Sequence, residues 1–413
     1  MKMMGIEKKL IGFLEKHKWL ALYAAVTILS MAARFTLRGV ISGDMRIFLR
    51  PWAELLKEQG GIHALGGQMG NYGVLYQTII ALMTYIPIQH EYAYKIFSMV
   101  FDFALAGVSA ALVMDLSGSR LKSFLTYAFA IMLPSVLLNS AAWGQCDSIY
   151  TFFCVLCFRL LTREKYTLAF LSYGMAFAFK LQAIFLAPFL LLFYVKEKKF
   201  SLLNFLLIPA VMIAASIVGI IEGRSVLAPF RIYLDQAGYY PSISLNYPSF
   251  WNLLITNDVE DFYAELSGFC IAVALTVLLA EMVLLLKRKE RLSHRTSLFA
   301  AFLMSYSCVL FLPAMHERYS YLYVIFGLML AVLEPRTLIS YAFLIMLDLQ
   351  TYGIYLFKTP IFPWYVLGLI NTVCFLSYVL FWGKIFLRPA SGGLNRDSGR
   401  IREKAPSVRE EMV

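Results

Sequence analysis

The hydrophobic positions of this chain are gathered in long stretches, and short polar segments separate them. A membrane-spanning helix needs about 20 mostly apolar residues, or about 17 at the short end. Stretches near this length recur along the whole chain, so the pattern predicts about twelve spanning helices. We place them at residues 19–36, 93–114, 123–138, 149–162, 166–180, 181–195, 200–221, 263–286, 296–313, 321–334, 337–355 and 364–384.

Composition supports this interpretation of the pattern. Hydrophobic residues make up 60% of the 413 positions, charged residues make up 15%, and the mean hydropathy is +0.68. Ordinary soluble domains are about 45–50% apolar and about 25% charged. These values exclude a soluble enzyme, a disordered chain and a coiled coil. We therefore expect an all-α polytopic integral membrane protein with a bundle of about 12–13 transmembrane helices.

The basic residues predict which helix ends face the cytoplasm. Lys and Arg outnumber Asp and Glu by 37 to 26, and basic residues favour the cytoplasmic side. They cluster at 2–18, 120–122, 163–165, 196–199, 287–295 and from 384 onward. Both termini are therefore predicted to be cytoplasmic, and segments 37–92, 139–148, 222–262, 314–320 and 356–363 to be outside.

One further apolar run, at residues 74–89, is short. The alternation of sides holds if this run is re-entrant or interfacial, and it breaks if the run spans the membrane. We favour the first alternative. The net charge of +11 suits anionic lipid headgroups, and the absence of a basic soluble domain from the sequence excludes nucleic acid as a partner.

The chain divides into three parts by composition. Residues 1–18 form a basic cytoplasmic leader, 19–386 form the membrane domain, and the polar segment 387–413 is expected to be a disordered cytoplasmic tail. No repeat of fixed period is visible in the sequence. Cys154 and Cys157 form a C-x-x-C pattern inside an apolar run, and we interpret them as small core residues because metal and redox sites need polar access.

The first predicted outer segment contains an acidic residue of interest. Asp44 follows the first helix and begins a segment, up to Glu58, whose apolar residues recur at helical spacing. This spacing predicts an amphipathic helix on the membrane surface. The carboxylate of Asp44 either caps that helix or takes part in chemistry, and spacing alone favours the cap. The apolar residues of the segment are Ile47, Phe48, Trp52, Leu55 and Leu56.

Two other outer segments carry polar residues between apolar helices. Segment 139–148 presents Trp143, Gln145 and Asp147, with interfacial anchoring and helix capping as the alternatives to a functional role. Gly144 indicates a tight backbone conformation there. Lys180 interrupts an apolar region, where its ammonium either snorkels to the headgroups or binds a phosphate.

The remaining polar candidates lie later in the chain. Segment 222–262 is rich in aromatic residues that would form a sugar-stacking or lipid-facing surface, and segment 316–319 is either a phosphate-binding element or an ordinary polar loop. Intramembrane carboxylates are functional candidates by default, while an arginine near a cytoplasmic helix end is expected to snorkel. The aromatic residues are Tyr239, Tyr240, Tyr247, Phe250 and Trp251, the intramembrane carboxylates are Asp102, Glu281 and Asp348, and the arginine is Arg159.

Taken in order, these elements resemble a known family. An acidic residue after the first helix, followed by NYGVLYQ, WGQCDS, FKLQA, SLNYPSFW and MHERY, is similar to the bacterial relatives of the second GPI-anchor mannosyltransferase. These are polytopic glycosyltransferases of the GT-C superfamily. The resemblance runs from about Asp44 to Tyr319, and WGQCDS and MHERY are its most specific parts. The chain lacks the family's frequent Tyr-Pro-Pro-Leu-Tyr at 71–76 and Lys-Pro-Gln at 180–182.

The resemblance implies an inverting hexosyltransferase at the extracytoplasmic face. The donor would be a hexose, mannose by the family's default, on a polyprenyl phosphate, and the acceptor a hydroxyl of a glycan, glycolipid or protein. Asp44 matches the family's catalytic carboxylate and would act as general base. Lys180 and Arg318 would balance the phosphate charge. The implied binding residues are Trp143, Gln145, Asp147, Lys180, Gln182, His316, Glu317, Arg318 and Tyr319.

Other interpretations stay open from the sequence. The single-carboxylate mechanism needs no metal, although Asp44 and Asp147 together offer oxygen ligands to a divalent cation. A transporter or flippase of lipid-linked sugars, a glycan ligase or polymerase, and a non-enzymatic assembly partner are the alternative functions. The charge pattern by itself puts residues 44, 147, 180 and 316–318 on one side of the membrane, as a shared site requires.

Overall fold

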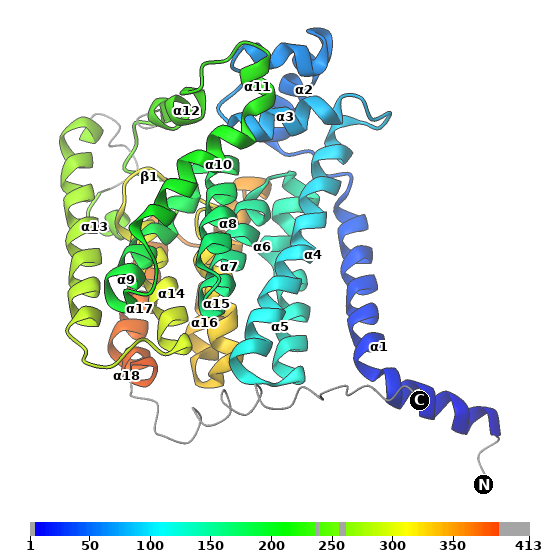
Figure 1. Ribbon diagram of the computed structural model, residues 1–413, viewed down its shortest axis with the longest axis vertical. Coiled ribbons are helices and arrows are strands. Elements are labelled where there is room, and N and C mark those ends of the chain that lie inside the picture. The colour runs from blue at the N-terminus through cyan, green and yellow to red at the C-terminus, as the bar shows by residue number, and fades with distance from the viewer. Residues whose placement is uncertain (1–4, 237–238, 256–261, 388–413) are drawn as a thin grey trace, which may run out of the picture.

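The computed structural model describes residues 5–236, 239–255 and 262–387, and these residues form a bundle of helices with one short pair of strands (Figure 1). Five segments in these ranges are long and apolar enough to cross a membrane: Glu15–Leu37, His90–Ser117, Tyr263–Leu286, Pro335–Phe357 and Trp364–Phe386. Arg120–Met132 and Pro134–Trp143, bent by 49°, make a sixth if they form one broken span. The chain is therefore an all-α, multi-pass membrane protein.

The longer helices are α1 (Gly5–Leu37), α4 (His90–Ser117), α13 (Tyr263–Leu286), α16 (Leu338–Phe357) and α17 (Trp364–Ser377). The shorter helices of the bundle are α5 (Arg120–Met132), α6 (Pro134–Leu137), α7 (Asp147–Thr162), α8 (Tyr166–Phe179), α9 (Ala187–Glu197), α10 (Leu207–Ala215), α11 (Ile217–Ile221), α14 (His294–Phe311), α15 (Tyr321–Leu333) and α18 (Gly383–Phe386). The predicted segments all fall on helical residues, although several are broken by 3₁₀ or π-helical turns.

The expected count of 12–13 crossings goes beyond what helix length supports. Helix α15, for example, has 13 residues and a length of about 20 Å, against a hydrocarbon core of about 30 Å. Every residue of α15 is buried, and α14 is buried from Thr296 to Phe311. Short or broken helices are tolerated at membrane depth when protein surrounds them, because their backbone ends find partners inside the bundle.

The outer helices present apolar side chains outward. Helices α1 and α13 stand on opposite sides of the bundle in Figure 1. Ile28 and Phe35 of α1 are 69% and 63% exposed. Leu275 and Leu284 of α13 are also largely exposed. Such faces suit lipid rather than water. Helix α1 begins at Gly5 and is kinked at His17, next to the predicted boundary of the leader. Residues 388–413 of the predicted tail lie outside the described residues.

One end of the bundle carries the short elements α2 (Arg50–Glu58), α3 (Val74–Met83) and α12 (Ala228–Gln236) (Figure 1). Helix α3 has 10 residues, or about 15 Å, so the run 74–89 does not cross as a helix, in agreement with the alternative that we favour. The connection of α13 to α14, α18 and the first turns of α1 lie at the other end. The described parts of the predicted basic segments at these three elements thus share the end opposite α2 and α3.

The predicted amphipathic helix after Asp44 exists, but its buried face differs from the prediction. Ile47 is 66% exposed and Leu55 is 39% exposed, whereas Leu49 and Ala53 are buried. The reason is a π-helical turn, η1 (Met45–Leu49), before α2. A π-turn rotates the following residues relative to an α-helical pattern, so the spacing of apolar residues assigns them to the wrong face.

One pair of short strands connects two segments that lie far apart in the sequence. Strand β1 (Ser244–Leu245) pairs in parallel with β2 (Met315–His316), with Ser244 opposite Met315 and Leu245 opposite His316. This ladder fixes the loop after α14 against the aromatic segment 222–262. All six cysteines are buried and unbridged, so Cys154 and Cys157 are core residues of α7, as predicted.

Candidate active site

Asp44 stands where the chain turns from α1 into the π-helical turn η1. Its carboxylate makes no capping hydrogen bond. The backbone N–H of Met45 donates instead to the hydroxyl of Ser42, over 3.1 Å. The capping alternative for Asp44 is therefore wrong, because Ser42 already provides that bond. The carboxylate of Asp44 is free to point into the protein.

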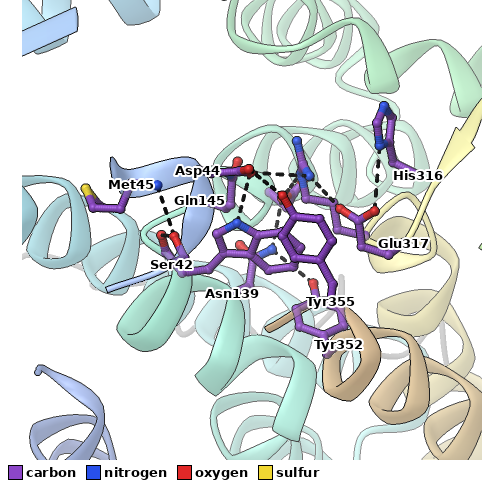
Figure 2. Close-up of polar contacts among 12 residues, drawn as sticks. Ser42, Asp44, Met45, Asn139, Gln145, His316, Glu317, Tyr352 and Tyr355 are labelled. Atoms are coloured by element: carbon purple, nitrogen blue, oxygen red, sulfur yellow. Dashed lines mark hydrogen bonds and ion pairs between the residues drawn. The ribbon is translucent and has the colours of Figure 1, made fainter. Parts of the chain in front are cut away.

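Three side chains from distant segments donate to the Asp44 carboxylate (Figure 2). Its Oδ2 atom accepts from Trp143 Nε1 over 3.0 Å and from Gln145 Nε2 over 2.8 Å. Its Oδ1 atom accepts from the Tyr355 hydroxyl over 2.5 Å. These donors come from segment 139–148 and from the end of α16, so the site exists only in the folded bundle.

Gly144 allows Trp143 and Gln145 to reach the same carboxylate. The π-helical turn η3 (Leu138–Trp143) ends at Gly144, whose φ of +78° lies in the left-handed region that disfavours other residues. The reversal is closed by a bond from Gln145 N to Asn139 O over 2.9 Å. The prediction of a tight conformation at Gly144 is confirmed.

Asp147 and Lys180 form a buried ion pair beside Asp44. Lys180 Nζ lies 2.6 Å from Asp147 Oδ1, and the two side chains are 7% and 0% exposed. Asn139 Nδ2 donates to the other oxygen of Asp147 over 2.9 Å. The snorkelling alternative for Lys180 is therefore wrong, and so is simple capping by Asp147. Helix α8 ends at Phe179, and the extended backbone of Lys180 turns its side chain inward.

Arg318 connects the carboxylates of the site. Its Nη1 atom lies 2.8 Å from Glu317 Oε1 and 3.9 Å from Asp44 Oδ2, and its Nε atom lies 3.6 Å from Asp147 Oδ2. Burial alone would lower the pKa of Arg318, but Glu317 and Asp147 raise it well above its ordinary value. The guanidinium also lies over the Trp143 ring, 5.3 Å from its centroid.

Glu317 is fully buried, and its neighbours act on its pKa. Burial would raise the pKa of this carboxyl, but the adjacent His316 and the charge of Arg318 lower it below its ordinary value. His316 Nδ1 lies 3.6 Å from Glu317 Oε2, and the ring of Tyr240 packs edge-on against the imidazole with centroids 5.0 Å apart. The four residues 316–319 are thus part of a charged cluster and not an ordinary polar loop.

These side chains surround a pocket of about 670 Å³. Of the predicted site residues, Trp143 and Asp147 are fully buried and lie outside the pocket lining. The others line it directly: Asp44, Gln145, Lys180, Gln182, His316, Glu317, Arg318 and Tyr319. The predicted site residues therefore converge at one end of the bundle.

Sequence reasoning missed several contributors. Tyr355 lies inside a predicted spanning helix, where an aromatic residue near the end is ordinary, so no local signal distinguishes it. Tyr72 donates to Gln145 Oε1 over 2.7 Å, and burial raises the pKa of its phenol, which keeps the donor protonated. Its place in NYGVLYQ was the only available hint. Tyr352 accepts from Asn139 over 3.0 Å.

The aromatic segment divides between the pocket and the core. Tyr239 and Tyr240 line the pocket, as the sugar-stacking alternative requires. Tyr247 and Trp251 are buried instead: the Tyr247 hydroxyl bonds to Tyr323, and Trp251 Nε1 donates to Phe311 O over 2.7 Å. Phe250 packs against the core. The predicted common surface of all five aromatic residues is therefore wrong.

The intramembrane carboxylates have partners that the sequence did not identify. Asp102 pairs with Arg34 of α1 over 2.8 Å, Glu281 accepts from Ser307 over 2.6 Å, and Asp348 accepts from Ser320 over 2.5 Å. None of them lines the pocket in the described part of the chain. Arg159, in the last turn of α7, pairs with Asp115, near the C-terminal end of α4, over 2.8 Å. Arg159 therefore has a carboxylate partner and does not simply snorkel.

The carboxylates of the site are bonded to protein donors, and metal binding stays untested. In the described ranges no group of three or more His, Cys, Asp or Glu side chains is placed to hold a metal ion. Protein donors already bond to both oxygens of Asp44 and both oxygens of Asp147.

No protein-family model matches this chain, and no curated protein matches its sequence.

Proposed function

We propose that this protein is a membrane glycosyltransferase that moves a hexose, with mannose as the default, from a polyprenyl-phosphate-linked donor to an acceptor hydroxyl. The acceptor belongs to a glycan, a glycolipid or a protein. The observation that carries the proposal is one pocket at one end of a membrane bundle that combines a held carboxylate, Asp44, with a buried guanidinium, Arg318. The chemistry of such a transfer needs both.

Asp44 suits the role of general base. Within the described residues, Oδ1 accepts one hydrogen bond, from Tyr355, and a carboxylate oxygen has two acceptor positions. The acceptor hydroxyl would donate to Oδ1 and lose its proton as its oxygen attacks the anomeric carbon. The bond between the anomeric carbon and the phosphate oxygen breaks, and the lipid phosphate keeps the electron pair. One direct displacement inverts the anomeric centre.

Arg318 and Lys180 suit stabilisation of the leaving phosphate. Arginine binds phosphate oxygens through its fixed fork of donors, and buried cations act strongly on charge that develops beside them. Both cations are already paired with carboxylates in the structure. Three carboxylates, Asp44, Asp147 and Glu317, thus face these two cations. We infer that the donor phosphate competes with Asp147 or Glu317 for them.

The aromatic and apolar walls suit the rest of the donor. Tyr239 and Tyr240 offer ring faces to a sugar, and Phe48, Trp52 and Leu181 offer apolar surface to the first isoprene units. The connection of α13 to α14 and the first turns of α1, which carry basic residues, lie at the end opposite α2 and α3 (Figure 1). Trp52 of α2 and Gly73, just before α3, line the pocket, and basic residues favour the cytoplasm. We therefore propose that the pocket opens to the extracytoplasmic side and that the N-terminus is cytoplasmic.

The test is turnover of purified protein in lipid with radiolabelled polyprenyl-phosphate hexoses. Free polyprenyl phosphate and labelled product are followed for the wild type and for Asp44→Asn. We expect Asp44→Asn to lower kcat by about 10²–10⁴-fold, the contribution of a positioned general base. The matched control is Asp115→Asn at the opposite end of α4, which should leave kcat unchanged.

Each alternative outcome identifies a different function. A folded Asp44→Asn variant that turns over like the wild type excludes Asp44 as the base. No hexose release with any donor, together with lipid-linked sugar movement across vesicles that survives Asp44→Asn, indicates a transporter. Transfer of whole oligosaccharides, with single hexoses refused, indicates a ligase or polymerase.

A further inference from the structure

The Tyr355 hydroxyl is the least necessary of the three donors to Asp44. Trp143 and Gln145 are both buried and both bond to Oδ2, so they already fix the rotation of the carboxylate. Tyr355 bonds instead to Oδ1, the oxygen that remains for a ligand, over 2.5 Å. The Tyr355 hydroxyl therefore covers Oδ1 and adds little to the orientation of the carboxylate.

Tyr355 also stands at the accessible edge of the site. It lies on the last turn of α16, which ends at Phe357, and it is only partly buried. The following residues, 357–363, are exposed. Its ring is stacked on Trp143, with centroids 4.5 Å apart and an interplanar angle of 17°, and it lines the pocket (Figure 2). A flat ring with an O–H donor therefore fills the space between Trp143 and Oδ1.

We propose that this space is the acceptor subsite, and that the acceptor is a pyranose whose hydroxyl replaces the Tyr355 hydroxyl on Asp44 Oδ1. The inference rests on the proposed transferase function. The acceptor presents the same chemistry as Tyr355: a six-membered ring with an apolar face for Trp143 and an O–H donor for the carboxylate. The acceptor is thus a glycan or glycolipid rather than a serine or threonine of a protein.

The transfer then proceeds from the displaced state. The acceptor hydroxyl donates a hydrogen bond to Oδ1. Its oxygen then forms the new bond to the anomeric carbon, and its proton passes to Asp44. The bond from the anomeric carbon to the phosphate oxygen breaks, and the phosphate takes the electron pair beside Arg318. Tyr355 returns to Oδ1 after the product leaves and the proton is lost to solvent. In this scheme Tyr355 shapes acceptor specificity and does not take part in the chemistry.

The experiment measures acceptor binding separately from turnover. Wild type, Tyr355→Phe and Tyr355→Ala in lipid nanodiscs are titrated calorimetrically with methyl mannoside and methyl glucoside. Loss of the competing hydroxyl should tighten hexoside binding about fivefold in Tyr355→Phe, the worth of one hydrogen bond of about 1 kcal/mol. Tyr365→Phe is the control: its side chain is 61% exposed and is not part of the pocket lining, so affinity should not change.

Every result bears on the inference. The inference is overturned if Tyr355→Phe binds hexosides with unchanged or weaker affinity. It is also overturned if neither the wild type nor any variant binds hexosides. A fall in kcat of tenfold or more with an unchanged acceptor KM also overturns it, because Tyr355 would then position Asp44. If the wild type transfers no hexose but hexosides bind more tightly to Tyr355→Phe, the transferase proposal fails and the sugar subsite stands.

Discussion

Among the described residues, the buried charges around Arg34 and those around Arg318 differ in what surrounds them. Arg34 and Asp102 are joined over 2.8 Å, with side chains 1% and 0% exposed. Arg34 Nη1 donates to Ile131 O over 2.9 Å, and Ser140 donates to Asp102 over 2.5 Å. This closed group connects α1, α4 and the segment before Trp143. Its one cation and one carboxylate are matched.

The charged group at the pocket is open and unevenly matched. Lys180 and Arg318 face three carboxylates, and both cations line a cavity of about 670 Å³. Arginine and aspartate occur in both groups. The comparison teaches that a buried charge in a membrane bundle indicates a site when it borders a cavity. A closed pair acts as a brace.

Breaking the closed pair should have the largest effect on folding. Asp102→Ala leaves the Arg34 guanidinium buried without its carboxylate, which costs about 3–5 kcal/mol. We expect a large fall in the thermal unfolding temperature of the purified protein in detergent, with a low yield. The double variant Arg34→Met/Asp102→Leu should recover most of this stability, because apolar residues of similar size replace buried pairs well. A double variant as unstable as the single one would show that the pair does more than brace the helices.

The same exchange at the pocket should separate folding from function. Lys180→Met leaves Asp147 without its ammonium and should destabilise the fold, while Lys180→Met/Asp147→Leu should regain stability. Turnover of the double variant should nevertheless stay at least about 100-fold below that of the wild type, since electrostatic stabilisation is lost. Stability and hexose release are measured on the same preparation. Wild-type turnover in the stable double variant would assign this pair to the same bracing role as Arg34 and Asp102.

The smallest of these effects should come from Glu317 and should depend on pH. The pKa of Glu317 is lowered in the folded protein, so its charge contributes stability above the ordinary pKa of a glutamate, near 4.5, and loses it as the pH falls through the lower folded value. Glu317→Gln should therefore cost about 1–3 kcal/mol at pH 7, and less below pH 4.5. Unfolding temperatures of both proteins between pH 3.5 and 7 test this. A difference that does not shrink in acid would mean that Glu317 acts through packing.

The helical architecture could be predicted from sequence to a useful extent, and the site only in part. Apolar runs located α13 to the residue and α4 to within three residues at each end, since lipid demands such runs. The count of 12–13 crossings stays a prediction, because buried helices such as α15 are too short to cross by length alone. Charge and motif order predicted that Asp44, Lys180 and Arg318 share one end. The π-helical turn at 45–49 and the role of Tyr355 were not predictable, because neither leaves a local pattern.

The sequence by itself determined the class of protein, the approximate helix positions and the candidate charged residues, because the free energy of placing apolar and basic residues relative to a membrane is a local property of the chain. Only the tertiary structure decided which carboxylates are closed in pairs and which face a cavity. That distinction depends on distances between residues far apart in sequence: Asp44 meets Tyr355, and Asp102 meets Arg34, only when the helices pack. Electrostatic partners in a low-dielectric interior are chosen by packing within a few ångströms, which no periodicity encodes.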